Sequence, residues 1–187
     1  MHVLSRKNLR TSRESGNINI MAPRIALCGP GRCGKDTAAD WLAANTKLRY
    51  HQSTSQAAAD ICFKKLHKKY GYKTPQEAFV DRHKHRKEWA EIIWEYNKPD
   101  GIRLYRDMVR TNDVLNGIRK SNELHACKQL GLIDLAIWID RPGYFEEGSM
   151  SLCVEECDII LPNFEQGDTF PKHYYEKLSN LAKAIGV

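Results

Sequence analysis

The sequence of 187 residues predicts an α/β fold, with a parallel sheet of about five strands and helices on both faces. Two observations support this class. Short apolar runs alternate with longer segments of helical periodicity, the pattern of strand–helix–strand units. In addition, a glycine-rich turn separates the first apolar run from the first helical segment. The length suits one domain, and 42% hydrophobic residues suffice for a packed core.

Each expected element ends at a recognisable break. The strands are expected at residues 24–28, 47–51, 113–118, 132–140 and 158–161. The helices are expected at residues 35–45, 53–70, 75–97, 102–110, 121–130 and 172–185. Glycine and proline lie between these segments, for example in Pro99-Asp-Gly101 and Arg141-Pro-Gly143.

The formal charge is unevenly distributed along the chain. Residues 62–120 contain 15 Lys and Arg against 8 Asp and Glu, whereas residues 121–187 contain 5 against 11. A basic middle segment and an acidic C-terminal segment of the chain indicate that one face of the protein attracts anions. We therefore expect small anionic substrates and no stable nucleic acid partner.

The cysteines and the hydropathy indicate the compartment. The six cysteines form no C-x-x-C pair and no zinc spacing. No stretch approaches the length of a membrane span, and residues 1–20 lack the apolar run of a signal peptide. We expect a cytoplasmic protein with reduced thiols and no membrane partner.

Gly29-Pro-Gly-Arg-Cys-Gly34-Lys35 matches the phosphate-binding pattern G-x-x-x-x-G-K between an expected strand and an expected helix. Glycines allow backbone N–H groups to approach phosphate oxygens, and the lysine reaches the β- and γ-phosphates. The alternative is a glycine-rich turn with a surface lysine. Candidate ATP contacts are Gly29, Gly31, Arg32, Cys33, Gly34, Lys35, Asp36 and Thr37.

The position after Lys35 departs from this pattern. Asp36 stands where the motif has Ser or Thr for Mg²⁺, and Thr37 follows it. Either Thr37 serves the metal, directly or through water, or Asp36 holds a metal-bound water or caps the loop.

The segment Gly34-Lys-Asp-Thr-Ala-Ala-Asp40 resembles the G-K-D-T-x-x-D loop of phage deoxynucleoside monophosphate kinases, within the P-loop nucleoside monophosphate kinase fold. Four later blocks follow in the order of that family. They are residues 49–55, Asn116-Gly-Ile-Arg119 with Glu123, residues 139–143 and residues 158–163. The resemblance covers residues 24–185, and the loop is its most specific part.

The resemblance implies ATP-dependent phosphoryl transfer to a deoxynucleoside monophosphate, with ATP and Mg²⁺ as cofactors. It also implies the cytoplasm of a host cell, if the protein is phage-encoded, and a possible homodimer. Ser53 would line the substrate pocket, and Asn163 would lie at the nucleotide. One position departs from the family, because Gly117 replaces the acidic residue that usually stands two positions before the motif arginine.

Arginines follow the loop in the middle of the chain, where they could bind an acceptor phosphate bidentately. Arg82 and Arg86 are spaced i, i+4, and Arg103 and Arg106 are spaced i, i+3, so each pair shares a helix face. Arg119 follows an expected strand at its carboxyl end, where ligands of open α/β sheets bind. The alternative is that these helix faces are simply solvated. The candidate catalytic residues are Lys35, Arg86 and Arg119, and the candidate substrate contacts are Ser53, Arg82, Arg86, Arg103, Arg106, Arg119 and Glu123.

The expected domain organisation follows from these assignments. Residues 1–20 are expected to be a disordered extension, and residues 21–187 a single P-loop kinase domain. Residues 53–112 would form its substrate-binding helical part and residues 141–150 a lid. Two alternatives to the kinase of deoxynucleoside monophosphates remain. One is a kinase of a nucleoside or another small phosphorylated metabolite, and the other is a non-catalytic nucleotide-binding P-loop protein.

Overall fold

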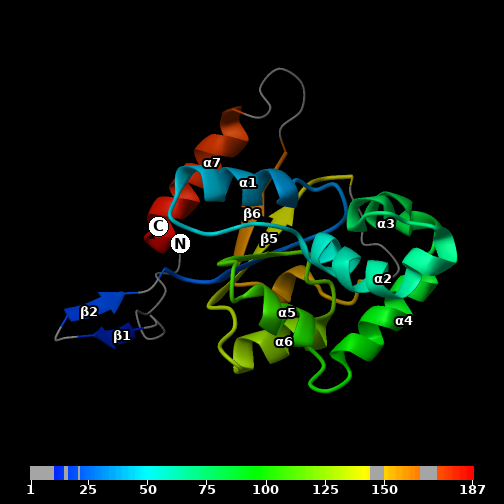
Figure 1. Cartoon of the computed structure of the whole chain (residues 1–187). Coiled ribbons are helices and arrows are strands. Elements are labelled where there is room, and N and C mark those ends of the chain that lie inside the picture. Colours follow the sequence, from blue (N-terminus) through cyan, green and yellow to red (C-terminus); the bar gives the residue numbers. More distant parts are fainter. Residues whose placement is uncertain (1–10, 15–16, 21, 144–149, 165–171) are drawn as a thin grey trace.

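A four-stranded parallel sheet lies at the centre of the computed structural model, which describes residues 11–14, 17–20, 22–143, 150–164 and 172–187 (Figure 1). The strands lie in the order β4-β3-β5-β6. Their bounds are Ile25–Cys28 for β3, Val114–Asn116 for β4, Leu135–Asp140 for β5 and Ile159–Pro162 for β6. All three pairings are parallel, as expected for strands joined by helical crossovers.

Helices cover both faces of this sheet, which confirms the predicted α/β architecture (Figure 1). On one face, Ile25 and Leu27 of β3 pack in a cluster with residues of α1 and α7. On the other, Ala26 and Cys28 pack with residues of α2, α5 and α6. The alternation follows from the two-residue period of a strand. The helix bounds are Lys35–Asn45 for α1, Thr54–Tyr70 for α2, Arg103–Met108 for α5, Ser121–Gln129 for α6 and Lys172–Ile185 for α7.

The prediction of five strands is wrong, because residues 47–51 form no strand beside β4. The carbonyl of Arg49 accepts hydrogen bonds from the N–H groups of Asp113 (2.7 Å) and Val114 (3.2 Å). Its own N–H, however, donates to the carboxylate of Asp113, and His51 N–H donates to the side chain of Asn112. Side chains therefore take the donors that a strand ladder would need, and the segment runs along the sheet edge without joining it.

The helical region beside the sheet is divided where the sequence predicted one helix from 75 to 97. The structure has α3 (Pro75–Asp81), a 3₁₀ turn η1 (Arg82–Lys84) and α4 (Arg86–Asn97). The Asp81 carboxylate accepts from Tyr72 (2.8 Å) and lies 2.6 Å from the Lys84 ammonium. These contacts stabilise a tight turn between α3 and α4. Because of this turn, α4 does not continue the direction of α3.

The N-terminal segment differs from the disordered extension that the sequence predicts. Thr11–Glu14 (β1) and Asn17–Ile20 (β2) pair as a separate antiparallel sheet. At the other predicted mobile segment, residues 144–149 of the expected lid lie outside the described residues. None of the helices in the described part is long and apolar enough to cross a membrane.

Candidate functional site

The glycine-rich loop lies between the end of β3 and the start of α1, as predicted. Gly29 and Gly34 adopt φ angles of 129° and 102°, which favour glycine. A Cβ on Gly29 would lie 2.7 Å from the Ile139 carbonyl oxygen, and one on Gly34 would lie 2.5 Å from Asn163 Nδ2. Glycine is therefore required at both positions because the loop packs directly against the ends of β5 and β6.

Lys35 is held over this loop by the loop's own backbone. Its Nζ donates to the carbonyl of Gly29 at 2.9 Å and to that of Pro30, and it lies 3.4 Å from Cys33 Sγ. Burial raises the pKa of the Cys33 thiol, and the backbone N–H groups of Lys35 and Cys33 oppose this as hydrogen-bond donors to its Sγ. The loop thus presents an ammonium group and backbone N–H groups at the start of α1, a chemistry that suits the phosphates of ATP.

Two buried side chains support the loop from behind. Asn163 Nδ2 donates to the Cys33 carbonyl at 2.8 Å, and Tyr174 of α7 donates its hydroxyl to the Gly34 carbonyl at 3.2 Å. Both Asn163 and Cys33 are fully buried. Asn163 was expected to contact the nucleotide, but the structure places it behind the loop, outside the lining of the cavity described next.

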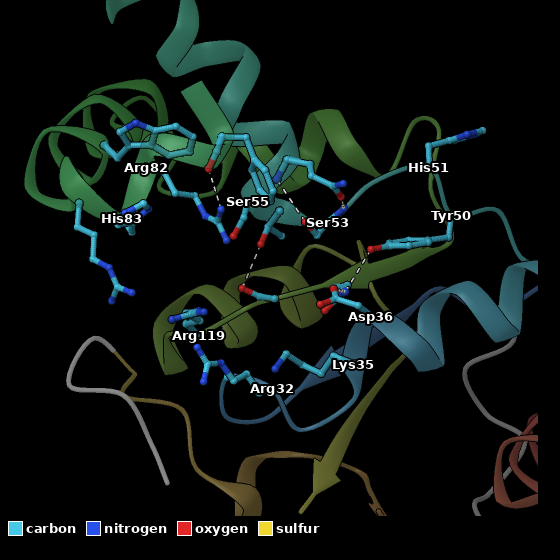
Figure 2. Close-up of a pocket in the computed structure, with 18 of the residues that line it drawn as sticks. Arg32, Lys35, Asp36, Tyr50, His51, Ser53, Ser55, Arg82, His83 and Arg119 are labelled. Carbon is cyan, nitrogen blue, oxygen red and sulfur yellow. Dashed lines mark hydrogen bonds between the residues drawn. The ribbon is translucent and has the colours of Figure 1, made fainter. Parts of the chain in front are cut away.

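A cavity of about 920 Å³ opens in front of the loop (Figure 2). Gly31, Arg32 and Lys35 line one side of it. The opposite walls come from three places: residues 50–56, the region from Phe79 to Ala90, and residues 116–119 at the carboxyl end of β4. The volume is in the range of cavities that bind nucleotide-sized ligands.

Three of the predicted arginines meet in this cavity, although they come from different elements. Arg82 lies in η1, Arg86 begins α4, and Arg119 follows β4. Burial lowers the pKa of Arg82, and the positive charges of Arg86 and Arg119 lower it further. With Arg32 and Lys35, five cationic side chains line the cavity against two carboxylates, those of Asp36 and Asp40, which gives a net charge of +3. This concentration of positive charge suits an anionic ligand.

The side chain of Arg82 is held by contacts with Phe79, whereas the side chain of Arg86 has no such contacts among the described residues. The Arg82 guanidinium donates to the Phe79 carbonyl at 2.7 Å, and its central carbon lies 3.9 Å from the centroid of the Phe79 ring. No carboxylate among the described residues forms an ion pair with Arg86. The carbonyl of Arg119 accepts from the N–H groups of Ser151 and Leu152, which places the segment after the expected lid beside this arginine.

The end of the cavity away from the arginines contains carboxylates and a small hydrogen-bond network. Asn116 Nδ2 donates to the Asp36 carboxylate at 2.6 Å and to the Tyr50 hydroxyl at 3.2 Å (Figure 2). Burial raises the pKa of Tyr50, and the charges of Asp36 and Asp40 add to this, while the hydrogen bond with Asn116 acts in the opposite direction. The cavity is thus polarised, with arginines at one end and carboxylates at the other.

Position 117 requires glycine for a steric reason that is visible only in the structure. Its φ is 108°, and a Cβ there would lie 2.5 Å from Thr54 Oγ1. Thr54 in turn donates this hydroxyl to the Gly117 carbonyl at 3.2 Å. The close approach of α2 therefore leaves no room at this position for the acidic side chain of the resembled family.

Only one of the two predicted metal-binding residues lines the cavity. Asp36 lines the cavity, whereas Thr37, also a candidate, does not. Within the described residues, no group of three or more His, Cys, Asp or Glu side chains could hold a metal ion alone. Mg²⁺ that arrives with a nucleotide needs only one or two protein oxygens, because phosphates and water supply the rest. The Asp36 carboxylate fits that role.

Three predicted substrate contacts do not reach the cavity. The Arg103 guanidinium lies 4.6 Å from the Tyr96 ring centroid, and Arg106 Nε donates to Asp100 at 2.9 Å. The Glu123 side chain is 14% exposed, and its carboxylate accepts from the Tyr105 hydroxyl at 2.8 Å and lies 3.9 Å from the Lys120 ammonium. Partial burial raises the pKa of this carboxyl. Arg103 thus contacts α4, Glu123 connects α6 to α5, and Arg106 contacts the turn before α5.

Several cavity residues were not predicted. They include Asp40, Tyr50, His51, Gln56, Phe79, His83 and Trp89. Helical spacing offered a signal for two of them, because Phe79 precedes Arg82 by three positions and Trp89 follows Arg86 by three. Tyr50 and His51 were assigned to a strand, so no site role was expected there. Ser53, which was predicted, does line the cavity.

Comparison with known proteins adds no assignment to this geometry. No model of a known protein family matches the chain, and a search of curated proteins finds no sequence relative.

Proposed function

We propose that this protein transfers the γ-phosphoryl group of ATP to a deoxynucleoside monophosphate, in a P-loop kinase fold. The observation that carries the proposal is the shared cavity, in which the phosphate loop faces Arg82, Arg86 and Arg119. A monophosphate kinase must gather two phosphate groups that repel each other and align them. A cavity of net charge +3 with a glycine-rich loop on one wall supplies this. The sequence resemblance to phage deoxynucleoside monophosphate kinases supports the same activity.

Each group has a defined task in the proposed reaction. The N–H groups of residues 31–35 and the Lys35 ammonium bind the phosphates of ATP and neutralise charge in the transition state. Mg²⁺, when bound, neutralises phosphate charge further, beside the Asp36 carboxylate. Arg82, Arg86 and Arg119 orient the acceptor phosphate opposite the loop. An acceptor phosphate oxygen is already nucleophilic, so no general base is required.

A second candidate, a nucleotide-binding protein without transfer activity, is favoured by one observation. Gly117 stands where the resembled kinases usually have an acidic residue, so the site contains one carboxylate fewer for Mg²⁺ than those enzymes. The polarised cavity favours the kinase, because a protein that only binds ATP has no need for three arginines facing the loop.

The decisive experiment is a screen of purified protein with ATP and Mg²⁺ against nucleosides, nucleoside monophosphates and other small phosphorylated metabolites, with ADP release as the readout. We expect release that depends on a deoxynucleoside monophosphate. Lys35→Ala is the control for contaminating kinases, since loss of the loop ammonium should lower turnover by about a hundredfold or more. ATP binding without acceptor-dependent ADP release would favour the non-catalytic candidate.

A further inference from the structure

A second cavity of about 350 Å³ opens between the first half of α2 and the start of α3. The first cavity, in front of the glycine-rich loop, is called the phosphate cavity below. Three residues line both cavities: His51, Gln56 and Phe79. The two spaces are therefore adjacent and share a wall. A ligand whose phosphate lies among the arginines could extend its other end into this second space.

The walls of the second cavity suit a flat ring. Ala59, only 3% exposed, forms a small apolar surface on α2, and Pro75 and Phe79 line the side of α3. The Arg82 guanidinium stacks on the Phe79 ring, with its central carbon 3.9 Å from the ring centroid. One aromatic side chain thus borders the second cavity and also positions an arginine of the phosphate cavity.

Two polar groups of α2 face this cavity in a fixed order. Ser53 N–H donates to Gln56 Oε1 at 2.8 Å, so the oxygen of that amide is engaged and its NH₂ group remains as a donor. Asp60 lies one turn further along α2 and also lines the cavity. Among the described residues, its carboxylate has no hydrogen bond or ion pair. A donor and an uncommitted acceptor are therefore adjacent on one helix face.

From this arrangement we infer that the second cavity binds the base of the acceptor nucleotide and selects guanine. Guanine offers a carbonyl acceptor next to two N–H donors, on N1 and N2, and these can bind an amide NH₂ and both oxygens of a carboxylate. Adenine and cytosine offer the carboxylate only an exocyclic amino group, and thymine offers only one ring N–H. This inference rests on the proposed function, because it assigns the base of the proposed acceptor.

The test compares kcat/KM for dGMP, dAMP, dCMP and dTMP with the intact protein and with Asp60→Asn. We expect dGMP to be preferred by about tenfold or more, because a site that hydrogen-bonds its substrate rejects analogues lacking those groups. In Asp60→Asn the dGMP value should fall about tenfold while the other three change little. Glu91→Gln, an exposed carboxylate of α4 that lines neither cavity, is the matched control and should leave all four values unchanged.

Calorimetric titration of each monophosphate, without ATP, separates this inference from the proposed function. Selective binding of dGMP that Asp60→Asn weakens, without any phosphoryl transfer, supports the guanine pocket and overturns the kinase proposal. Transfer with a preference for another base, or with a preference that Asp60→Asn leaves intact, overturns the guanine pocket alone. Neither binding nor transfer of any monophosphate overturns both.

Discussion

Asn116 donates its side-chain amide to the Asp36 carboxylate at 2.6 Å, which joins the end of β4 to the first turn of α1 across 80 residues of sequence. Asn116 is 2% exposed, whereas Asp36 lies open to the phosphate cavity. The buried amide therefore fixes the orientation of a carboxylate at the site where Mg²⁺ is expected. The same Nδ2 reaches the Tyr50 hydroxyl, so a single side chain orders the acidic end of the cavity.

Asn116→Ala should lower the free energy of unfolding by about 1.5–3 kcal/mol, because it removes a hydrogen bond to a charged group. Urea denaturation measures this change. Tyr50→Phe, which removes only the 3.2 Å contact, should cost less. Asn180→Ala, at an exposed position of α7, is the control and should change stability by less than about 0.5 kcal/mol. Equal stability of Asn116→Ala and Asn180→Ala would contradict a structural role for the amide.

Replacing Arg86 or Arg119 by Ala should lower kcat/KM for the acceptor by about tenfold to a hundredfold, since each removes a charge-assisted contact of roughly 1.5–3 kcal/mol. Arg-to-Lys variants should recover only part of this, because an ammonium cannot bind phosphate bidentately. ATP affinity without acceptor, measured by calorimetry, should change little. Arg110→Ala is the control, as its side chain is 74% exposed and lines neither cavity. If ATP affinity falls as much as acceptor affinity, these arginines belong to the ATP side.

Gly117→Ala should destabilise the protein more than Gly71→Ala does. Both glycines have positive φ, 108° and 74°, so both variants carry backbone strain of about 1–2 kcal/mol. Only at Gly117 would the new Cβ also meet Thr54 Oγ1 at 2.5 Å, whereas nothing lies within 4 Å at Gly71. Thermal denaturation compares the two variants. In a Thr54→Ala background the excess cost at Gly117 should shrink, and an unchanged excess would show that the hydroxyl is not its cause.

Glu123 should make stability fall as pH rises above the ordinary glutamate range. Burial raises the pKa of this carboxyl from the usual 4.5, so the folded state binds its proton more tightly than the unfolded state. The resulting stabilisation is complete below pH 4.5 and is lost as pH rises through the higher folded-state pKa. Glu123→Gln, which still accepts from Tyr105, should lack this loss. The difference in unfolding free energy between the two proteins across this pH range is the measurement, and a constant difference would show that the pKa of Glu123 is not raised in the folded protein.

The position of the glycine-rich loop between β3 and α1 could be predicted from the sequence because its determinants are local. Two glycines with positive φ, a lysine and a helix start all fall within residues 29–35, next to an apolar run. The missing strand at 47–51 could not be predicted in this way. Whether that segment joins the sheet depends on the side chains of Asn112 and Asp113, which take its N–H donors and lie more than 60 residues away.

The arginines show a different limit. Helical spacing predicts that Arg82 and Arg86 share one face and that Arg103 and Arg106 share another, but not which face meets the cavity. Arg82 and Arg86, at the break formed by η1, line the cavity in front of the glycine-rich loop. Arg106 instead donates to Asp100, outside this cavity. Tertiary packing, which no local pattern encodes, makes that choice. The second cavity has the same origin, because it arises only where α2 packs against α3.

The supports behind the phosphate loop have a consequence for folding during synthesis. Asn163 and Tyr174 bind the carbonyls of Cys33 and Gly34, and they follow these residues by 130 and 140 positions. The loop leaves the ribosome early, yet its back wall is complete only after α7 has been made. A growing chain that ends before α7 therefore contains the whole glycine-rich motif without the contacts that fix its backbone. We expect nucleotide affinity to arise late in synthesis, with the docking of the last helix.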